Sequence, residues 1–431
     1  MKRIFPALLC CLSLLVAAAR PGLAQTVTRT APADGDNLET WLLVVGPGPA
    51  IYSWWGHIGL VLIDTVSGRE YFYDYGNFNF NGDNFIGNFA MGRLWFLMLR
   101  FPLQPYVDHA LDSGRSVRMH RLDLPAAQKQ AMREKLEWNY RPENRVYLYD
   151  HFDDNCATRI RDIIDNLVDG QLHAALAEPS DLSLRQLARQ YADHEAAGGW
   201  VVDFLLSGKV DRPMERWDEL FVPEYLEKAV LGLSYRDESG VLRPLVSESR
   251  TLFTSTTFAD GGENSRLRYL VTVFLVILGL ILPAGLLLVF KRHGWFDFYR
   301  ALLLVLAAIP GSVLFFMMTF SDHDSTHGNW NILLASPLLL LIVPLTLWRH
   351  RRRARQDPAV RRRADRLALW FSAGLVGLGL LALLLGWLPA FRQGNAAMAL
   401  NFLLPYGLFL WADWRRYRKA PTPTTVDQLI A

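Results

Sequence analysis

The chain has 431 residues, a formal net charge of +3 and 51% hydrophobic residues. The net charge is a weak guide to partners, because the basic residues are concentrated in a few loops. The sequence contains no phosphate-binding loop, no nucleic-acid-binding patch and no internal repeat. We therefore expect no nucleic-acid partner.

The N-terminal segment 1–24 has the layout of a secretory signal peptide. Two basic residues precede an apolar run that extends to about Ala19, and small residues lead up to Ala24. We expect cleavage after Ala24, with an uncleaved membrane anchor as the alternative, and both export the segment that follows. Cleavage removes both N-terminal cysteines and leaves Cys156 alone, which excludes an intramolecular disulfide in the mature chain.

Residues 25–262 have the mixed, charged composition of an exported domain that is large enough for its own core. Within it, the stretch SWWGHIGLVLIDTVSGREYFYDYGNFNF alternates well enough to predict two strands. They cover about 57–64 and 69–76, with a turn at Ser67 and Gly68. We therefore expect an antiparallel hairpin that begins at a histidine.

The length of the hairpin loop decides which side chain meets His57. With a loop of two or four residues, the neighbours of His57 on its face of the sheet are Asp74 and Gly76. Asp74 then accepts a hydrogen bond from His57 and holds its ring, which is the arrangement we expect. A loop of three residues offers Tyr75 or Asn77 instead, because a slip of one residue exchanges the two faces.

A second stretch, YDHFDDNCATRIRDIID, places Cys156 at the start of a predicted helix, which Asp154 or Asn155 can cap. A cysteine in the first turn faces unpaired backbone N–H groups and the positive end of the helix dipole, which stabilise a thiolate. Cys156, His57 and Asp74 would then form the nucleophile, base and carboxylate that acyl transfer uses. The alternatives are a buried free thiol and a histidine bonded to backbone.

The strand that begins with GH, the hairpin and the helix that begins with NC resemble the permuted branch of the NlpC/P60-like superfamily. More closely, WWGHIGLVLID, YDYGNF and YLYDHFDDNCATRIRDIID resemble the family of Lnb N-terminal periplasmic domains over about residues 38–250. The resemblance implies an α+β, permuted papain-like fold with an antiparallel sheet and a helix that carries the nucleophile. It assigns Cys156 as the nucleophile and His57 as the base, whereas Asp74 as third member rests on the strand argument.

Further residues are candidates for orienting the catalytic groups or binding substrate. They are Tyr75, Asn77, Asn155 and Arg159. Asn155 and Arg159 match the family motif, and a structural role such as an ion pair is favoured for Arg159.

Beyond Arg268 the sequence becomes apolar in runs near the length that crosses a bilayer. We expect an all-α bundle of five transmembrane helices over 263–420 and a cytoplasmic tail at 421–431. The predicted spans are 269–290, 299–320, 330–348, 367–388 and 396–412. Cationic loops follow the first, third and fifth spans, and such loops stay in the cytoplasm. This predicts a bacterial inner-membrane protein with its N-terminal domain in the periplasm and its C-terminus in the cytoplasm.

The loop SDHDSTHGNWN between the second and third spans lies on the same side as the exported domain. Its residues His323, His327, Asn329 and Asn331 are candidates for binding a lipid headgroup, with a solvated loop as the alternative. The spacing of the two histidines supports a metal site only weakly, and no metal is expected.

Together these features predict a membrane-bound thiol acyltransferase of the lipoprotein N-acyltransferase type. As the resemblance implies, Cys156 takes an acyl chain from a membrane phospholipid as a thioester and passes it to the N-terminal amine of a lipoprotein. This chemistry requires no cofactor. The alternatives are an exported cysteine peptidase or amidase that acts on cell-wall peptides, and a non-enzymatic membrane assembly factor.

Overall fold

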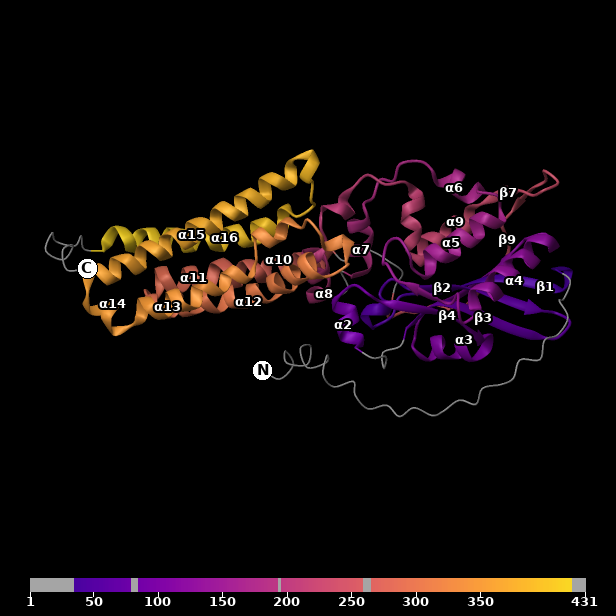
Figure 1. Ribbon diagram of the computed structural model, residues 1–431, viewed down its shortest axis with the longest axis horizontal. Helices are drawn as coiled ribbons and strands as arrows, with labels where there is room; N and C mark the ends of the chain where they lie inside the picture. Colours follow the sequence, from indigo (N-terminus) through magenta and orange to yellow (C-terminus); the bar gives the residue numbers. More distant parts are fainter. Residues whose placement is uncertain (1–34, 79–83, 193–194, 259–264, 421–431) are drawn as a thin grey trace.

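The computed structural model describes residues 35–78, 84–192, 195–258 and 265–420. The expected signal peptide and C-terminal tail lie outside the described residues. Figure 1 shows a sheet domain covered by helices and, beside it, a bundle of long helices. An α+β domain with an antiparallel sheet, followed by an all-α bundle, confirms the predicted fold class. Its relation to permuted papain-like proteins stays a prediction.

Seven antiparallel strands form the main sheet, in the spatial order β6-β4-β3-β2-β1-β5-β9. In chain order they are β1 (Leu38–Val45), β2 (His57–Asp64), β3 (Arg69–Phe78), β4 (Trp95–Pro102), β5 (Val117–Leu122), β6 (Val146–Leu148) and β9 (Val246–Phe253). A small second sheet pairs β7 (Ser234–Arg236) with β8 (Leu242–Pro244). The strand that begins at His57 therefore lies in the middle of the main sheet.

Helices cover both faces of this sheet (Figure 1). Because side chains alternate along a strand, Leu60 of β2 packs with residues of α5 on one face, and Val61 packs with residues of α3 on the other. The helices of this domain are α2 (Phe85–Ala90), α3 (Leu103–Asp112), α4 (Ala126–Tyr140), α5 (Cys156–Leu167), α6 (Gln171–Leu176), α7 (Leu184–Ala192), α8 (Ala196–Leu205) and α9 (Pro223–Gly232). The largest core lies on the α5 face and includes residues of α4 and α9.

In the described part of the chain, five helices are long and apolar enough to cross a membrane. They are Tyr269–Val289, His293–Phe320, Trp330–His350, Pro358–Trp387 and Ala396–Lys419. Their helical segments are α10 (Ser265–Val276), α11 (Leu282–Ala284), α12 (His293–Phe320), α13 (Ile342–His350), α15 (Pro358–Trp387) and α16 (Ala396–Lys419), with α14 (Arg352–Gln356) between α13 and α15. The helices α12 and α15 begin before the apolar runs that predict them, because polar first turns extend both beyond the hydrocarbon-spanning length.

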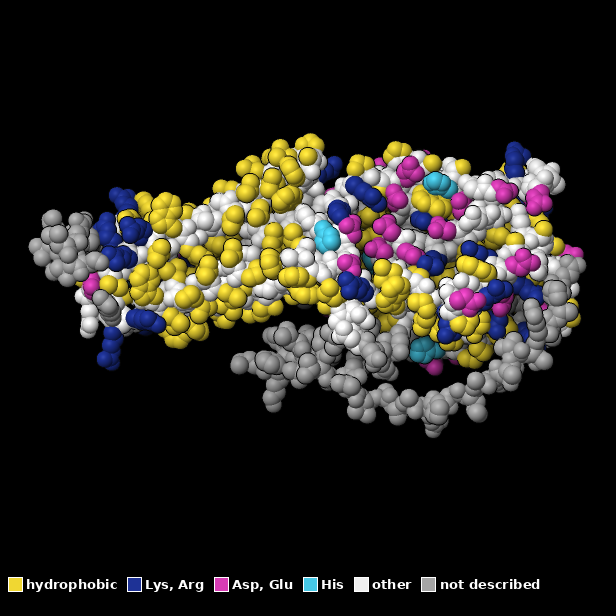
Figure 2. Space-filling view, viewed as in Figure 1, with side chains coloured by type: hydrophobic (Ala, Val, Ile, Leu, Met, Phe, Trp, Pro, Cys, Tyr) yellow, Lys and Arg dark blue, Asp and Glu magenta, His cyan; other side chains and the backbone are white. Residues whose placement is uncertain are grey.

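Lysine and arginine side chains gather at the end of the bundle that is farther from the sheet domain (Figure 2). Buried ion pairs join the helices near this end. Arg300 donates to Asp413 at 2.6 Å and Arg416 donates to Asp297 at 2.7 Å, so both pairs connect α12 with α16. Arg349 of α13 donates to Asp413 at 2.9 Å. The pairing keeps these charges compensated inside the bundle.

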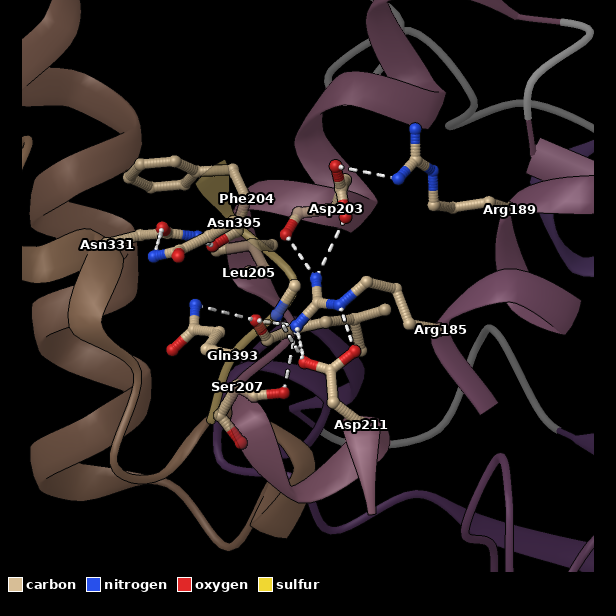
Figure 3. A network of polar contacts seen from close by, with 12 residues as sticks. Arg185, Arg189, Asp203, Phe204, Leu205, Ser207, Asp211, Asn331, Gln393 and Asn395 are labelled. Atoms are coloured by element: carbon tan, nitrogen blue, oxygen red, sulfur yellow. Dashed lines mark hydrogen bonds and ion pairs between the residues drawn. The ribbon is translucent and has the colours of Figure 1, made fainter. Parts of the chain in front are cut away.

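The sheet domain is docked on the bundle through a network around Arg185 of α7 (Figure 3). The guanidinium is 3% exposed and donates to both oxygens of Asp211, at 2.8 and 2.9 Å, and to Asp203 at 2.8 Å. Its Nη2 also donates to two backbone carbonyls that follow α8. Asp211 in turn accepts the backbone N–H of Gly394, in the loop between α15 and α16, at 2.8 Å.

The loop between α12 and α13 takes part in the same docking. Asn329 donates to the carbonyls of Phe204 and Leu205 at 3.0 and 2.9 Å, and Asn331 donates to Phe204 at 2.9 Å. Both asparagines are fully buried, and the Phe204 side chain belongs to the core of the bundle. The two amides are therefore engaged by protein carbonyls, whereas the sequence suggested a contact with a lipid headgroup.

Candidate active site

His57 is the first residue of β2 and pairs with Val45, the last residue of β1. It therefore lies at an end of the strands, and we call this end of the sheet the catalytic edge. The hairpin pairs Asp64 with Arg69, so residues 65–68 form a loop of even length. In this register Asp74 lies on the same face of the sheet as His57, as the sequence predicts for an even loop.

Asp74 holds the ring of His57. Its Oδ1 lies 2.7 Å from Nε2 of His57 and accepts the backbone N–H of Gly76 at 2.6 Å. A β-bulge between Asp74 and Asn77 interrupts the pairing of β3 with β4 at this point, a common feature beside active sites. Burial raises the pKa of Asp74, but the charge of His57 and the hydrogen bonds outweigh it and hold the pKa below its ordinary value. A Cβ at Gly76 would lie 2.3 Å from Cε1 of His57, so only glycine leaves room for the ring.

The two alternative partners of the histidine lie elsewhere. The side chain of Tyr75 is buried in the core on the α5 face, where its hydroxyl lies 2.6 Å from Nδ2 of Asn139. Asn77 donates to the backbone carbonyl of Asp74 at 3.3 Å and so supports the bulge. Neither side chain orients the ring directly.

Cys156 is the first residue of α5, and Asn155 caps the helix. The Oδ1 of Asn155 accepts the N–H groups of Ala157 and Thr158 at 2.8 and 3.0 Å, and its Nδ2 donates to two backbone carbonyls. Both side-chain polar atoms are engaged, so Asn155 acts on the site by fixing where the helix begins.

Cys156 and His57 interact although Cys156 belongs to a helix on one face of the sheet and the side chain of His57 lies on the other face. The helix α5 packs on the face opposite to the one that His57 shares with Asp74, and the two residues come together because each is the first of its element. Cys156 interacts electrostatically with the ring, whose Nε2 is engaged by Asp74. Burial lowers the pKa of His57, but the charges of Asp74 and Cys156 and the hydrogen bonds to both outweigh it and raise the pKa from 6.5 to about 10. The ring is therefore protonated at neutral pH.

Tyrosine side chains surround this pair. Burial, together with the charge of Cys156, raises the pKa of Tyr147 and of Tyr149. Burial, together with the charge of Asp74, also raises the pKa of Tyr106, which belongs to α3. These three tyrosines therefore lie within electrostatic range of the catalytic residues.

The remaining candidates have other contacts. Arg159 donates to both oxygens of Asp154, at 2.6 and 2.7 Å, and its guanidinium stacks on the ring of Tyr147 at 3.7 Å, which is a structural role. His327 Nε2 lies 2.8 Å from the carbonyl oxygen of Ser321, and the backbone N–H of His323 donates to the hydroxyl of the same serine. Within the described ranges, no three His, Cys, Asp or Glu side chains are arranged to hold a metal ion.

Two residues at the catalytic edge were not anticipated from the sequence. Tyr106 of α3 and Arg115, two residues before β5, both interact electrostatically with Cys156 and Asp74. Arg115 reaches the site through the pairing of β5 with β1, whereas Tyr106 packs on Phe72 of β3 with the ring centroids 4.1 Å apart. A lone arginine in a turn between a helix and a strand is the only local signal for Arg115, and it is a common one.

Comparison with known families gives two matches. Residues 25–190 match the Lnb N-terminal periplasmic domain, and residues 268–357 match the Lnb transmembrane domain. The first match includes His57, Asp74 and Cys156. No curated protein and no solved structure matches the chain. The chain is thus a multi-pass membrane protein with a periplasmic N-terminal domain, and it belongs to the Lnb family.

Proposed function

We propose that this protein is a cysteine acyltransferase that moves an acyl chain from a membrane phospholipid to the N-terminal amine of a lipoprotein. The observation that carries the proposal is the arrangement of Cys156, His57 and Asp74. The sulfur lies at the start of a helix and interacts electrostatically with a protonated imidazole, whose Nε2 lies 2.7 Å from a carboxylate. Such a set supports covalent acyl transfer.

In the first step the Cys156 thiolate attacks the ester carbonyl of the phospholipid. As the tetrahedral intermediate collapses, the ester C–O bond breaks, and the imidazolium of His57 gives its proton to the departing lysophospholipid oxygen. The products are a thioester on Cys156 and a neutral His57. Asn155 already occupies the N–H groups of Ala157 and Thr158, so the N–H of Cys156 itself is the first-turn donor that we assign to the oxyanion.

In the second step the free amine of the lipoprotein attacks the thioester carbonyl. The C–S bond breaks, the neutral ring of His57 accepts the proton of the amine, and an amide forms. The thiolate and the imidazolium are regenerated, so the cycle closes without a further reactant.

The position of the site relative to the bundle favours a lipid substrate over a cell-wall peptide. The helix α8 contributes Phe204 to the core of the bundle, and Trp200 stacks on Phe204 at 5.3 Å. Trp54, in the turn before His57, packs closely on Gly198 of the same helix, since a Cβ there would lie 2.3 Å from its indole. The segment that leads into the catalytic histidine therefore rests on a helix anchored in the membrane domain.

The same arrangement supports a location in the inner membrane with a cytoplasmic C-terminus. The basic side chains gather at the end of the bundle that is farther from the sheet domain (Figure 2). Because cationic loops stay in the cytoplasm, the opposite end, with the catalytic domain, would face the periplasm.

The test uses purified full-length protein and a phospholipid with a labelled acyl chain. Mass spectrometry of the peptide that contains Cys156 should show the added acyl mass, and a synthetic diacylglyceryl peptide with a free amine should remove it and gain an amide-linked chain. Cys156→Ala should abolish both products, whereas His109→Ala, an exposed histidine of α3, should leave them unchanged. Cleavage of cell-wall peptides without acylation of Cys156 would establish the hydrolase instead, and full function of Cys156→Ser would establish a non-enzymatic role.

A further inference from the structure

Arg115 lies at the same edge of the sheet as the catalytic residues. It precedes β5 by two residues, and β5 begins at Val117. Val45, the last residue of β1, pairs with both His57 and Val117, so the starts of β2 and β5 flank the end of β1. The strand order thus places Arg115, which belongs to a turn distant in sequence, at the same end of the sheet as His57.

The Arg115 side chain is held in place by the protein, but one of its hydrogen-bond donors has no acceptor among the described residues. Its Nε donates to the carbonyl of Gly46 at 2.9 Å, and its stem lies against Gly48, where a Cβ would be 2.9 Å from Cδ. Its Nη2 is buried and has no hydrogen-bond partner among the described residues. No carboxylate of the described chain forms an ion pair with it, in contrast to the paired arginines of the domain interface.

A buried guanidinium without a counter-ion is costly, because its charge and its N–H groups have lost water without gaining an acceptor. Most such groups in folded proteins are satisfied by protein, water or ligand. The charge of Arg115 also acts on Cys156 and on Asp74, and its turn lies at the end of the sheet where β2 begins with His57.

We propose that Arg115 binds the phosphate of the acyl donor and thereby places the donor's ester carbonyl at Cys156. This inference rests on the proposed function. Guanidinium groups bind phosphate oxygens through charge-assisted hydrogen bonds, and the orphaned Nη2 supplies such a donor. In a glycerophospholipid the phosphate and the ester carbonyls are attached to one glycerol, a few bonds apart. A phosphate held beside the sulfur, by an arginine anchored on Gly46, would leave an ester within reach of the sulfur itself.

The first experiment compares two acyl donors on the full-length protein in detergent. Dihexanoyl phosphatidylethanolamine carries a phosphate, and p-nitrophenyl hexanoate carries the same acyl chain without one. Arg115→Gln should slow thioester formation from the phospholipid at least about tenfold, the loss expected for one charge-assisted hydrogen bond, and should change the reaction of the phosphate-free ester less than about twofold. Arg121→Gln, which removes a partly exposed arginine of β5 paired with Glu39, is the matched control.

Two results of this comparison would overturn the inference. Equal losses with both donors would mean that Arg115 acts on the thiolate or on the fold, and circular dichroism of the variant separates these two. Unchanged rates with both donors would mean that no phosphate is held there. Arg115→Lys keeps the charge but not the planar fork, so we expect it to recover part of the phospholipid rate.

A second experiment does not depend on acyl transfer. Glycerol 3-phosphate should slow the alkylation of Cys156 by iodoacetamide in the wild-type protein and not in Arg115→Gln. If this protection occurs while the wild-type protein forms no thioester from phospholipid, the proposed function fails and the anion site remains. If inorganic phosphate protects equally and the two donors show no difference, the site binds free phosphate and the assignment to the acyl donor is wrong.

Discussion

Arg185 and Arg115 are both arginines of the periplasmic domain whose guanidinium groups are largely buried, but their surroundings differ. The guanidinium of Arg185 contacts two carboxylates and several backbone carbonyls, and each of its three nitrogens has an acceptor. Arg115 has one backbone acceptor, and its Nη2 has none in the described ranges. The first arginine is saturated by protein groups, whereas the second retains a donor that a ligand can use.

The same difference separates the two polar networks of the molecule. The docking network contains buried amides and ion pairs whose partners are all protein atoms, and it joins two domains. The catalytic edge contains a thiol, a protonated imidazole and an arginine whose Nη2 has no hydrogen-bond partner in the described residues. We therefore expect substitutions in the first network to change stability and substitutions in the second to change chemistry. The predictions below test this separation.

The largest effect is expected at His57. His57→Ala removes the group that donates and accepts the proton in both steps, so acyl transfer should fall by a factor on the order of 10³ or more. Above about pH 10, where the proton on His57 no longer stabilises the fold, the melting temperature should change little, because the ring lies at the ends of the strands rather than in the core. The rate of thioester formation and a thermal melt check the two parts. A variant that unfolds would show that the catalytic edge also supports the fold, and the proposed separation would then be wrong.

Arg185→Met should have the opposite profile. It leaves Asp203 and Asp211 without their buried partner, and breaking such a pair typically costs about 3–5 kcal/mol. We expect the docked state to melt at a markedly lower temperature and trypsin to cleave near the domain junction more readily. The rate at which iodoacetamide alkylates Cys156 should remain that of the wild type. The control is Arg216→Met, an exposed arginine paired with Glu178, which should change the melt hardly at all.

Asn331→Ala should have a smaller effect of the same kind. The substitution removes one donor to the Phe204 carbonyl and the acceptor of the Asn395 amide, which is expected to cost about 1–3 kcal/mol of docking stability. Thermal melting measures the loss. A variant that melts normally but no longer discriminates between phospholipids would support the headgroup role that the loop sequence suggested.

The sequence predicts those features of the fold and of the site that depend on local patterns. Alternation and a Ser-Gly turn were enough to predict the hairpin and, through its parity, the contact between Asp74 and His57. The capping residue was enough to place Cys156 at the first turn of a helix. These signals are local, because each depends on a spacing of a few residues. Apolar length likewise predicted the five long helices.

The roles of Asn329 and Arg115 depend on contacts between distant segments. The amide of Asn329 is buried against the carbonyls of the last two residues of α8, which lie more than a hundred residues earlier in the chain. Arg115 reaches the catalytic edge because β5 pairs with β1. In both cases the sequence shows a polar residue in a loop, and only the docking or the strand order decides whether that residue is exposed, structural or available to a ligand.

The pH dependence of stability offers a finer test of the catalytic edge. The pKa of His57 is raised from 6.5 to about 10 in the folded protein, so its protonation stabilises the fold fully below 6.5. This contribution is lost as the pH rises through about 10. The wild type should therefore melt above His57→Gln at low pH, and the difference should shrink across this window. Asp74→Asn should move the window to lower pH, since it removes the largest cause that raises the pKa. A difference that is independent of pH would contradict the ion pair.

The smallest effect is expected at the second contact between the domains. Arg93 and Asp322 form an ion pair at 2.8 Å, but both side chains are more than half exposed, so Arg93→Gln should cost less than about 0.5 kcal/mol. The neighbouring Gly92 is the matched comparison. It has a φ of 73°, and a Cβ there would lie 2.8 Å from the backbone nitrogen of His323. Gly92→Ala should therefore lower the melting temperature clearly while Arg93→Gln does not, because backbone approach rather than surface charge holds this contact. Equal effects of the two substitutions would show that exposed charges contribute to docking.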